Sequence, residues 1–391
     1  MQIVHAGAIR PITSFADMQA SVRESLAPIN LAIGGAAPVG VSVRLSHAAL
    51  ADPQLNAPNL TSLLGEYGLQ LAGMSAVSMR GGAKEQIHDP DWRTEERVGF
   101  MFGATNLLAD IADGEGTELG ITTNAFSHRN WLDVDFPGNW AALTLNLVRV
   151  VQHVATIHER TGITIHIDLE AEPGSVLRDT DDIVRFYQQW LLTRGAAMLS
   201  DRMHLTEGTA ADVLLRHVRL ALDTAHAAVV WDDAAASLDR FADVGIRIGR
   251  LQVSAALEAD IPAGARERSE LLTHLQAIGS DRLLQQVVAA REGVIVARYD
   301  DLPEAIVAID GSAGETWRIH THAPVLADRY GGWKSTRSAT ADWLRKIAAR
   351  GTEVGMIELR SATWDVVPAD DRGPVEEMVA REAAWVEAIL G

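Results

Sequence analysis

The stretch Leu220-Ala221-Leu222-Asp223-Thr224-Ala225-His226-Ala227-Ala228-Val229 is a short apolar run that ends at Asp223, with His226 three residues further on. A buried parallel strand stays apolar until it surfaces, and polar groups at its C-terminal end face a ligand rather than the core. A carboxylate and an imidazole placed there suit a divalent metal or acid–base chemistry. Taken alone, the pattern favours a simpler interpretation, in which Asp223 caps a helix and His226 faces solvent.

Two other apolar runs also end in carboxylates. One is the run over 163–173, which contains His166, Asp168 and Glu170, and the other is the run over 354–360, which contains Glu358. The C-terminal ends of parallel barrel strands meet at one mouth. Three acidic residues that each end a separate strand, Glu170, Asp223 and Glu358, therefore predict a metal site at that mouth.

Strand and helix patterns alternate along most of the chain. Apolar or alternating runs predict strands over 2–6, 39–46, 69–77, 118–124 and 246–254, and helical spacing predicts helices over 94–112, 140–161, 232–244 and 340–350. Short links between strands and helices indicate a parallel sheet. With 391 residues, the chain has the length of one domain, a single (β/α)8 TIM barrel over 1–391.

The alternation breaks between residues 255 and 316. Two short strands around Glu292-Gly293 predict a β-hairpin there, so we expect an insertion before the last barrel strand. Nine strand-like runs then compete for eight barrel positions. Either the run at Gln2 or the run at His320 lies outside the ring, and we favour His320 as part of the insertion.

The predicted barrel interior is unusually polar. Side chains alternate across a strand, so the inward set contains the charged and polar residues Arg44, His166, Asp168, Glu170, Asp223, Arg250, Gln252 and Glu358. Burying charges is costly unless they pair or bind a ligand. An internal ion pair between Arg44 and Asp168 explains part of the set. A guanidinium from Arg44 or Arg250 among the three carboxylates would neutralise them without metal.

Composition excludes several classes of function. The formal net charge is -18, which opposes binding to nucleic acid or to an anionic membrane surface. The chain has no cysteine, and no window approaches the roughly 20 apolar residues of a membrane span. The first ten residues lack the pattern of a signal peptide. We expect a cytoplasmic protein that is not embedded in a membrane.

The polar loop over 80–92 follows a predicted strand, so in a barrel it lies on the catalytic face. Lys84 and Trp92 in this loop are candidates to cover a substrate. A solvated loop that is pinned by a buried Trp92 is an equally good interpretation.

The sequence resembles the xylose isomerase-like TIM barrels and, within them, the metabolite traffic proteins called EboE. The resemblance covers nearly the whole chain, in the stretches 43–46, 84–86, 90–92, 169–173, 248–252, 286–288, 301–305, 320–324 and 364–368, and at Asp223 with 226–229. It implies a barrel that processes or moves a small metabolite.

In the sugar-epimerase branch of this superfamily, the metal is bound by two Glu, one Asp and one His. Glu170, Asp223 and Glu358 match three of these ligands, and Gln252 stands where the family has His. A Gln carbonyl binds a divalent ion more weakly than imidazole does, and His322 or His226 are candidates for the missing nitrogen. The resemblance thus implies a divalent metal (Mn²⁺, Mg²⁺ or Zn²⁺) held by Glu170, Asp223, Gln252, His322 and Glu358.

Two functions from different classes follow. The first is a metal-dependent sugar- or polyol-type isomerase, epimerase or lyase with Glu170, Glu358 and His226 as catalytic residues. Lys84, Trp92, Arg44 and His320 would bind the substrate. The second is a non-catalytic metabolite-binding protein, which Gln252 favours. A nuclease is opposed by the charge, and the oligomeric state stays open, with a homodimer as one alternative.

Overall fold

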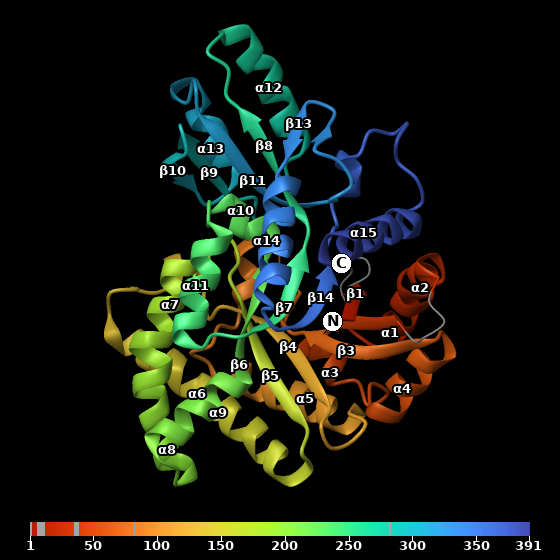
Figure 1. Ribbon diagram of the computed structural model, residues 1–391, viewed down its shortest axis with the longest axis vertical. Helices are drawn as coiled ribbons and strands as arrows, with labels where there is room; N and C mark the ends of the chain where they lie inside the picture. Colours follow the sequence, from red (N-terminus) through yellow and green to blue (C-terminus); the bar gives the residue numbers. More distant parts are fainter. Residues whose placement is uncertain (1, 6–11, 35–38, 82, 281–282) are drawn as a thin grey trace.

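Eight parallel strands close into a barrel in the computed structural model, which describes residues 2–5, 12–34, 39–81, 83–280 and 283–391 (Figure 1). The order around the ring is β1-β14-β7-β6-β5-β4-β3-β2. The strands are β1 (Gln2–His5), β2 (Val39–Arg44), β3 (Leu69–Ser75), β4 (Glu118–Asn124), β5 (Thr164–Glu170), β6 (Val218–Asp223), β7 (Ile248–Val253) and β14 (Val354–Leu359). The predicted eight-stranded barrel is confirmed. Ala6, which ends the first predicted strand, lies outside the described residues.

Helices surround the barrel and cover the apolar outer faces of its strands (Figure 1). The longest, α6, begins at Pro137 and ends before Gly162, whose left-handed backbone (φ 72°) stops the helix. Among the described residues, no helix is long and apolar enough to cross a membrane. The helices of the barrel are α1 (Phe15–Ser21), α2 (Ala27–Ile33), α3 (His47–Leu50), α4 (Ala57–Glu66), α5 (Glu95–Ile111), α6 (Pro137–Thr161), α7 (Thr180–Phe186), α8 (Ala196–Met203), α9 (Glu207–His217), α10 (Thr224–Val229), α11 (Ala234–Val244), α14 (Arg337–Arg350) and α15 (Val375–Leu390).

A second, six-stranded sheet stands above one end of the barrel and is formed by the chain between β7 and β14 (Figure 1). Its order is β10-β9-β11-β8-β13-β12, and it carries the helices α12 (Ala265–Ala277) and α13 (Leu302–Ala308). The strands are β8 (Ala255–Asp260), β9 (Val287–Arg291), β10 (Val294–Tyr299), β11 (Thr316–Ala323), β12 (Arg329–Tyr330) and β13 (Trp333–Ser335). The predicted hairpin is confirmed as β9 and β10, and His320 lies in this sheet, outside the ring.

The second sheet has an apolar cluster of its own, centred on Leu257, Val287 and Trp317. Its last strand ends at Ser335, so the segment between β7 and β14 that forms strands outside the ring is longer than the predicted 255–316. The expectation of one domain over 1–391 stays a prediction.

The chain passes from barrel to second sheet at Ser254, the one residue between β7 and β8. The Ser254 carbonyl accepts hydrogen bonds from the hydroxyls of Thr224 (2.9 Å) and Thr340 (2.9 Å). These bonds fix the direction in which β8 leaves the ring. The second sheet is therefore held over the C-terminal mouth, where β6, β7 and β14 also end.

Polar side chains fill the lower barrel interior, as the alternation predicts, but the predicted Arg44–Asp168 pair is wrong. Asp168 instead bonds to His166 on its own strand, at 2.6 Å between Oδ1 and Nδ1. Both side chains need space from neighbouring strands, because a Cβ at Gly249 would lie 1.9 Å from Asp168 Oδ1. Gly249 sits at a register shift between β6 and β7, a bulge that sequence alternation does not show.

Candidate functional site

Three neighbouring strands present Asp223, Gln252 and Glu358 side by side. The Cα partners are Asp223 with Gln252 across β6 and β7, and Gln252 with Glu358 across β7 and β14. All three are almost completely buried, at 5%, 1% and 0% exposure. The structure thus brings these predicted residues to one level at the mouth of the barrel.

Two histidines from the second sheet complete a cluster with Asp223. The Asp223 Oδ2 atom lies 3.6 Å from His320 Nε2 and 3.8 Å from His322 Nδ1. One ligand atom from each of these residues lies within 4.8 Å of the others. We call Asp223, His320 and His322 the imidazole half of the mouth. His320 was expected to bind substrate, and here it stands where a metal ligand would.

An irregularity in the pairing of β11 directs both histidines toward the mouth of the barrel. His320 and His322 are two residues apart, which places them on one face of the strand. The pairing of β11 with β8 runs regularly to Ile319 and resumes at Ala323 only after a register shift. Such irregularities re-aim side chains near functional sites. The two imidazole rings stand edge to face with their centroids 5.0 Å apart.

The donor set fits a divalent cation. Burial lowers the pKa of His322 to about 3, so this imidazole is neutral at physiological pH and its nitrogens are available as ligands. Burial acts to raise the pKa of Asp223, but the adjacent His320 and His322 hold it well below its usual value. His320 Nε2 is buried and, among the described residues, has no hydrogen-bond partner. One carboxylate and two imidazoles suit Zn²⁺ or Mn²⁺.

Glu358 and Glu170, also expected as metal ligands, face arginines instead. Glu358 forms a buried ion pair with Arg250, which also donates to Ser42 Oγ (2.8 Å) and to the Met74 carbonyl (3.1 Å). Arg360 lies 3.8 Å from Glu170 Oε1 and 3.9 Å from Glu358 Oε1. We call Glu358, Arg250 and Arg360 the guanidinium half of the mouth. Burial acts to raise the pKa of Glu358, but Arg250 and Arg360 hold it below its usual value.

Gln252 lies between the two halves. Its Nε2 donates to Glu170 Oε2 at 3.1 Å, while its Oε1 is buried and lacks a hydrogen-bond partner in the described chain. The oxygen that a cation would use is therefore the free atom of the amide.

Glu172 is a site residue that lies in the predicted run over 163–173 and received no role from the sequence. Burial and the adjacent carboxylate of Glu170 raise the pKa of Glu172 well above its usual value. Two adjacent carboxylates repel each other when both are ionised, so this surrounding favours the protonated form of Glu172, while Arg360 faces Glu170. Glu172 lies two residues after Glu170, and this spacing was a sequence signal that both side chains face the mouth. Arg360 lies two residues after Glu358, and the same signal applies to it.

The remaining candidates occupy other places. Trp92 is fully buried, and its Nε1 donates to Thr123 Oγ1 at 3.2 Å. Lys84 forms an ion pair with Asp301, at the start of α13 in the second sheet. Neither side chain joins the mouth cluster through the contacts of the described residues. The geometry of Trp92 matches the alternative of a tryptophan that pins the loop.

His226 lies at the edge of the mouth, with its ring centroid 5.6 Å from that of His320. Its Nε2 bonds to the Arg178 carbonyl at 2.7 Å. A carbonyl only accepts, so Nε2 carries the proton and Nδ1 has a free lone pair. Burial lowers the pKa of His226 to about 4. His226 is thus a neutral residue that is fixed through one nitrogen.

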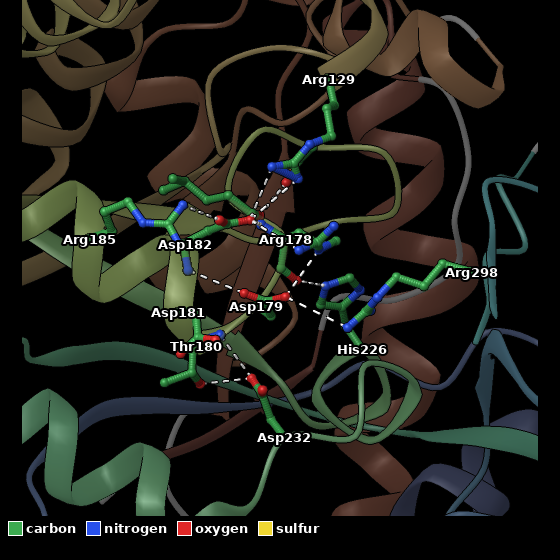
Figure 2. Close-up of polar contacts among 12 residues, drawn as sticks. Arg129, Arg178, Asp179, Thr180, Asp181, Asp182, Arg185, His226, Asp232 and Arg298 are labelled. Atoms are coloured by element: carbon green, nitrogen blue, oxygen red, sulfur yellow. Dashed lines mark hydrogen bonds and ion pairs between the residues drawn. The ribbon is translucent and has the colours of Figure 1, made fainter. Parts of the chain in front are cut away.

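A network of ion pairs fixes the loop between β5 and α7, which carries Glu172 (Figure 2). Asp179 caps α7 and lies 3.0 Å from Arg178 Nε and 3.9 Å from Arg298 of strand β10. Thr180 Oγ1 donates to Asp232 at 2.7 Å. The network joins barrel loops to strand β10 of the second sheet.

Comparisons with known proteins agree with a barrel and go no further. No protein-family model matches the chain, and no curated protein matches it. A D-allulose 3-epimerase from Methylomonas sp. in complex with D-allulose is similar over 99% of this chain and 96% of its own, at 12% identity and a TM-score of 0.47. A xylose isomerase-like TIM barrel protein from Mycobacterium smegmatis in complex with magnesium is similar over 100% and 96%, at 11% identity and a TM-score of 0.47. Similarity at this level concerns the barrel alone, so activity has to be inferred from the side chains.

Proposed function

We propose that this protein is a divalent-metal-dependent enzyme that moves a proton on a small polyhydroxylated metabolite, as an isomerase, epimerase or lyase. The observation that carries the proposal is the buried cluster of Asp223, His320 and His322 beside Glu172, whose pKa is raised by burial and by the adjacent Glu170. A structural core has no need of three adjacent metal-ligating groups next to such a carboxyl group.

Within this proposal, Asp223, His320 and His322 hold the metal, and the Gln252 oxygen is available beside them. A metal bound there would act as a Lewis acid on a hydroxyl or carbonyl oxygen of the metabolite. The chain's own candidates for proton transfer are Glu170 and Glu172, because they are adjacent carboxyl groups and the raised pKa of Glu172 favours its holding a proton that it can donate. Glu358 instead stays ionised beside Arg250 and orients the guanidinium half.

A second function is favoured by a specific observation. Arg250 and Arg360 already neutralise Glu358 and Glu170 without a metal ion, as a non-catalytic metabolite-binding protein would require. The EboE-type role in small-metabolite processing or traffic is compatible with either function and rests on the sequence stretches alone. We place the enzyme first because the ion pairs of Arg250 and Arg360 do not account for the buried cluster of Asp223, His320 and His322.

Metal content and proton exchange test the proposal together. Protein loaded with Mn²⁺ or Zn²⁺ and then desalted should retain about one equivalent by elemental analysis, whereas Asp223→Asn should lose it. Asparagine retains the cap on Ala225 N that Asp223 provides at 2.8 Å, so the variant should fold. His274→Ala, which removes an exposed histidine in α12, is the matched control and should keep the metal.

The second readout is deuterium incorporation from D₂O into D-fructose, D-tagatose or dihydroxyacetone, followed by NMR. We expect exchange at the carbon next to the carbonyl with the metal-loaded protein, and a loss of at least 100-fold in Glu172→Gln at unchanged metal content. Retained metal in Asp223→Asn would overturn the metal site. Bound metal without exchange on any of the three sugars or on D-fructose 6-phosphate would favour the binding protein.

A further inference from the structure

Two arginines at the mouth, Arg44 and Arg360, have buried guanidinium nitrogens without hydrogen-bond partners among the described residues. Arg44 is the last residue of β2, and Arg360 directly follows β14, with β1 between these two strands in the ring. The Nε and Nη2 atoms of Arg44 and the Nε atom of Arg360 are shielded from solvent, and no described residue accepts a hydrogen bond from them. Arg360 as a whole is only 6% exposed.

Other buried arginines of this protein are bonded. Arg97 donates to the carbonyls of Pro90 (2.8 Å) and Ala76 (3.0 Å), and Arg219 pairs with Glu118 at 2.6 Å. Arg250 reaches Ser42 Oγ and a carbonyl besides Glu358. A buried donor without a partner costs about 1–3 kcal/mol, and more when it is charged. Arg219 Nη2 and Arg250 Nε also lack hydrogen-bond partners, but both of these guanidinium groups form a close ion pair, which Arg44 does not have among the described residues.

The charges also leave room for an anion. Glu358 is already bound by Arg250, and among the described residues no carboxylate lies within ion-pair distance of Arg44. Burial, together with the nearby charge of Arg360, lowers the pKa of Arg44 to about 9. Arg360 reaches Glu170 and Glu358 only at 3.8 and 3.9 Å, so an oxyanion that accepts hydrogen bonds from both arginines would stabilise them.

We infer that Arg44 and Arg360 form an oxyanion subsite, so that the metabolite bound at this mouth carries a carboxylate or a phosphate group. The inference deepens the proposed function and rests on the mouth being its ligand site. The ligand would be a sugar acid or a sugar phosphate, whose hydroxyl groups extend toward the imidazole half and whose anionic end faces Arg44. Arg44 was expected from sequence to bind substrate, and this assigns the part of the substrate it binds.

Thermal melts with three probes of similar size test the inference: D-gluconate, D-glucose 6-phosphate and the neutral D-glucitol, at equal ionic strength. At least one anion should raise the melting temperature by several degrees, and glucitol should not. Arg44→Met should melt at the same or a higher temperature than wild type, because it removes an unbonded buried charge. The same variant should bind the anion at least tenfold more weakly.

The outcomes separate this inference from the proposed function. Asp223→Asn in chelator-treated protein should retain the anion-induced shift, so a failure of the wild-type protein to bind metal would count against the enzyme and not against the subsite. Equal shifts from glucitol and both anions would overturn the subsite, as would an Arg44→Met variant that melts lower and still binds the anion. If Arg44→Met does not fold, Arg44→Lys keeps the charge and should weaken anion binding. The exposed Arg247→Met is the matched control and should leave it unchanged.

Discussion

The imidazole half and the guanidinium half of the mouth handle buried carboxylates in opposite ways. Asp223 faces two imidazoles at 3.6 and 3.8 Å, whereas Glu358 is bonded to a permanent cation, Arg250. A carboxylate paired with arginine is complete as it stands. A carboxylate beside two imidazoles is a ligand set that a metal would stabilise. Under the proposed function, a metal would bind at the imidazole half, and the guanidinium half would serve the scaffold and the anion subsite.

Removing Arg250 should give the largest effect. Arg250→Met leaves Glu358 buried and unpaired, and breaking a buried pair in this way costs about 3–5 kcal/mol. We expect a loss of that size in the free energy of unfolding, measured by urea denaturation of chelator-treated protein. The loss should be clearly smaller in the double variant Arg250→Met, Glu358→Leu, in which neither charge remains.

The imidazole half supplies the contrasting measurement. In the same chelator-treated protein, Asp223→Asn should lower the free energy of unfolding by less than Arg250→Met does, because His322 is neutral and asparagine keeps the helix cap. Should Asp223→Asn destabilise the metal-free protein as much as Arg250→Met does, the two halves would not differ in the way described.

A third buried carboxyl, Glu382 of α15, sharpens the comparison because it has neutral partners only. Its Oε1 accepts hydrogen bonds from Ser361 Oγ (2.6 Å) and from Val325 N (2.8 Å). Burial raises its pKa from 4.5 to about 7. The native state thus holds the proton more tightly than the unfolded chain does. Stability from this group is fully present below pH 4.5 and is lost as the pH rises through about 7.

Glu382→Gln mimics the protonated form and retains an oxygen for both donors. At pH 8 we expect the variant to be more stable than wild type by on the order of 1–3 kcal/mol. At pH 4.5 the two should be nearly equal. Urea denaturation at both pH values measures this, and a difference that does not depend on pH would show that Glu382 does not titrate as described.

The barrel and much of its mouth followed from sequence because they depend on strand alternation. Alternation placed Asp223, Gln252 and Glu358 on the inner face, and the shared C-terminal ends of parallel strands placed them at one mouth. The same reasoning put His320 outside the ring. These features follow from local periodicity, which a sequence displays directly.

The contacts between side chains across the mouth could not be predicted from the sequence, because they depend on how neighbouring strands are offset. The irregular pairing of β11, which aims His320 and His322 at Asp223, has no local signal in the sequence. The bulge at Gly249 likewise fixes what Asp168 can reach. Glu172 and Arg360 each lie beyond a strand end; their spacing of two residues from Glu170 and Glu358 indicates the mouth, but the groups that they face there required the folded chain.

The smallest expected effect comes from the ion pair between Lys84 and Asp301, which ties a barrel loop to the sheet that carries the imidazole half. Both side chains are partly buried, at 26% and 13% exposure, so Lys84→Ala should cost about 0.5–1 kcal/mol of unfolding free energy. The exposed pair of Lys334 and Asp260 in the same sheet is the matched control, and Lys334→Ala should cost less. If the pair helps to seat β11, Lys84→Ala should also weaken metal binding several-fold by titration calorimetry, and Lys334→Ala should not. Equal metal affinity in both variants would mean that the second sheet holds His320 and His322 in place without this contact, through β8 and the Ser254 junction alone.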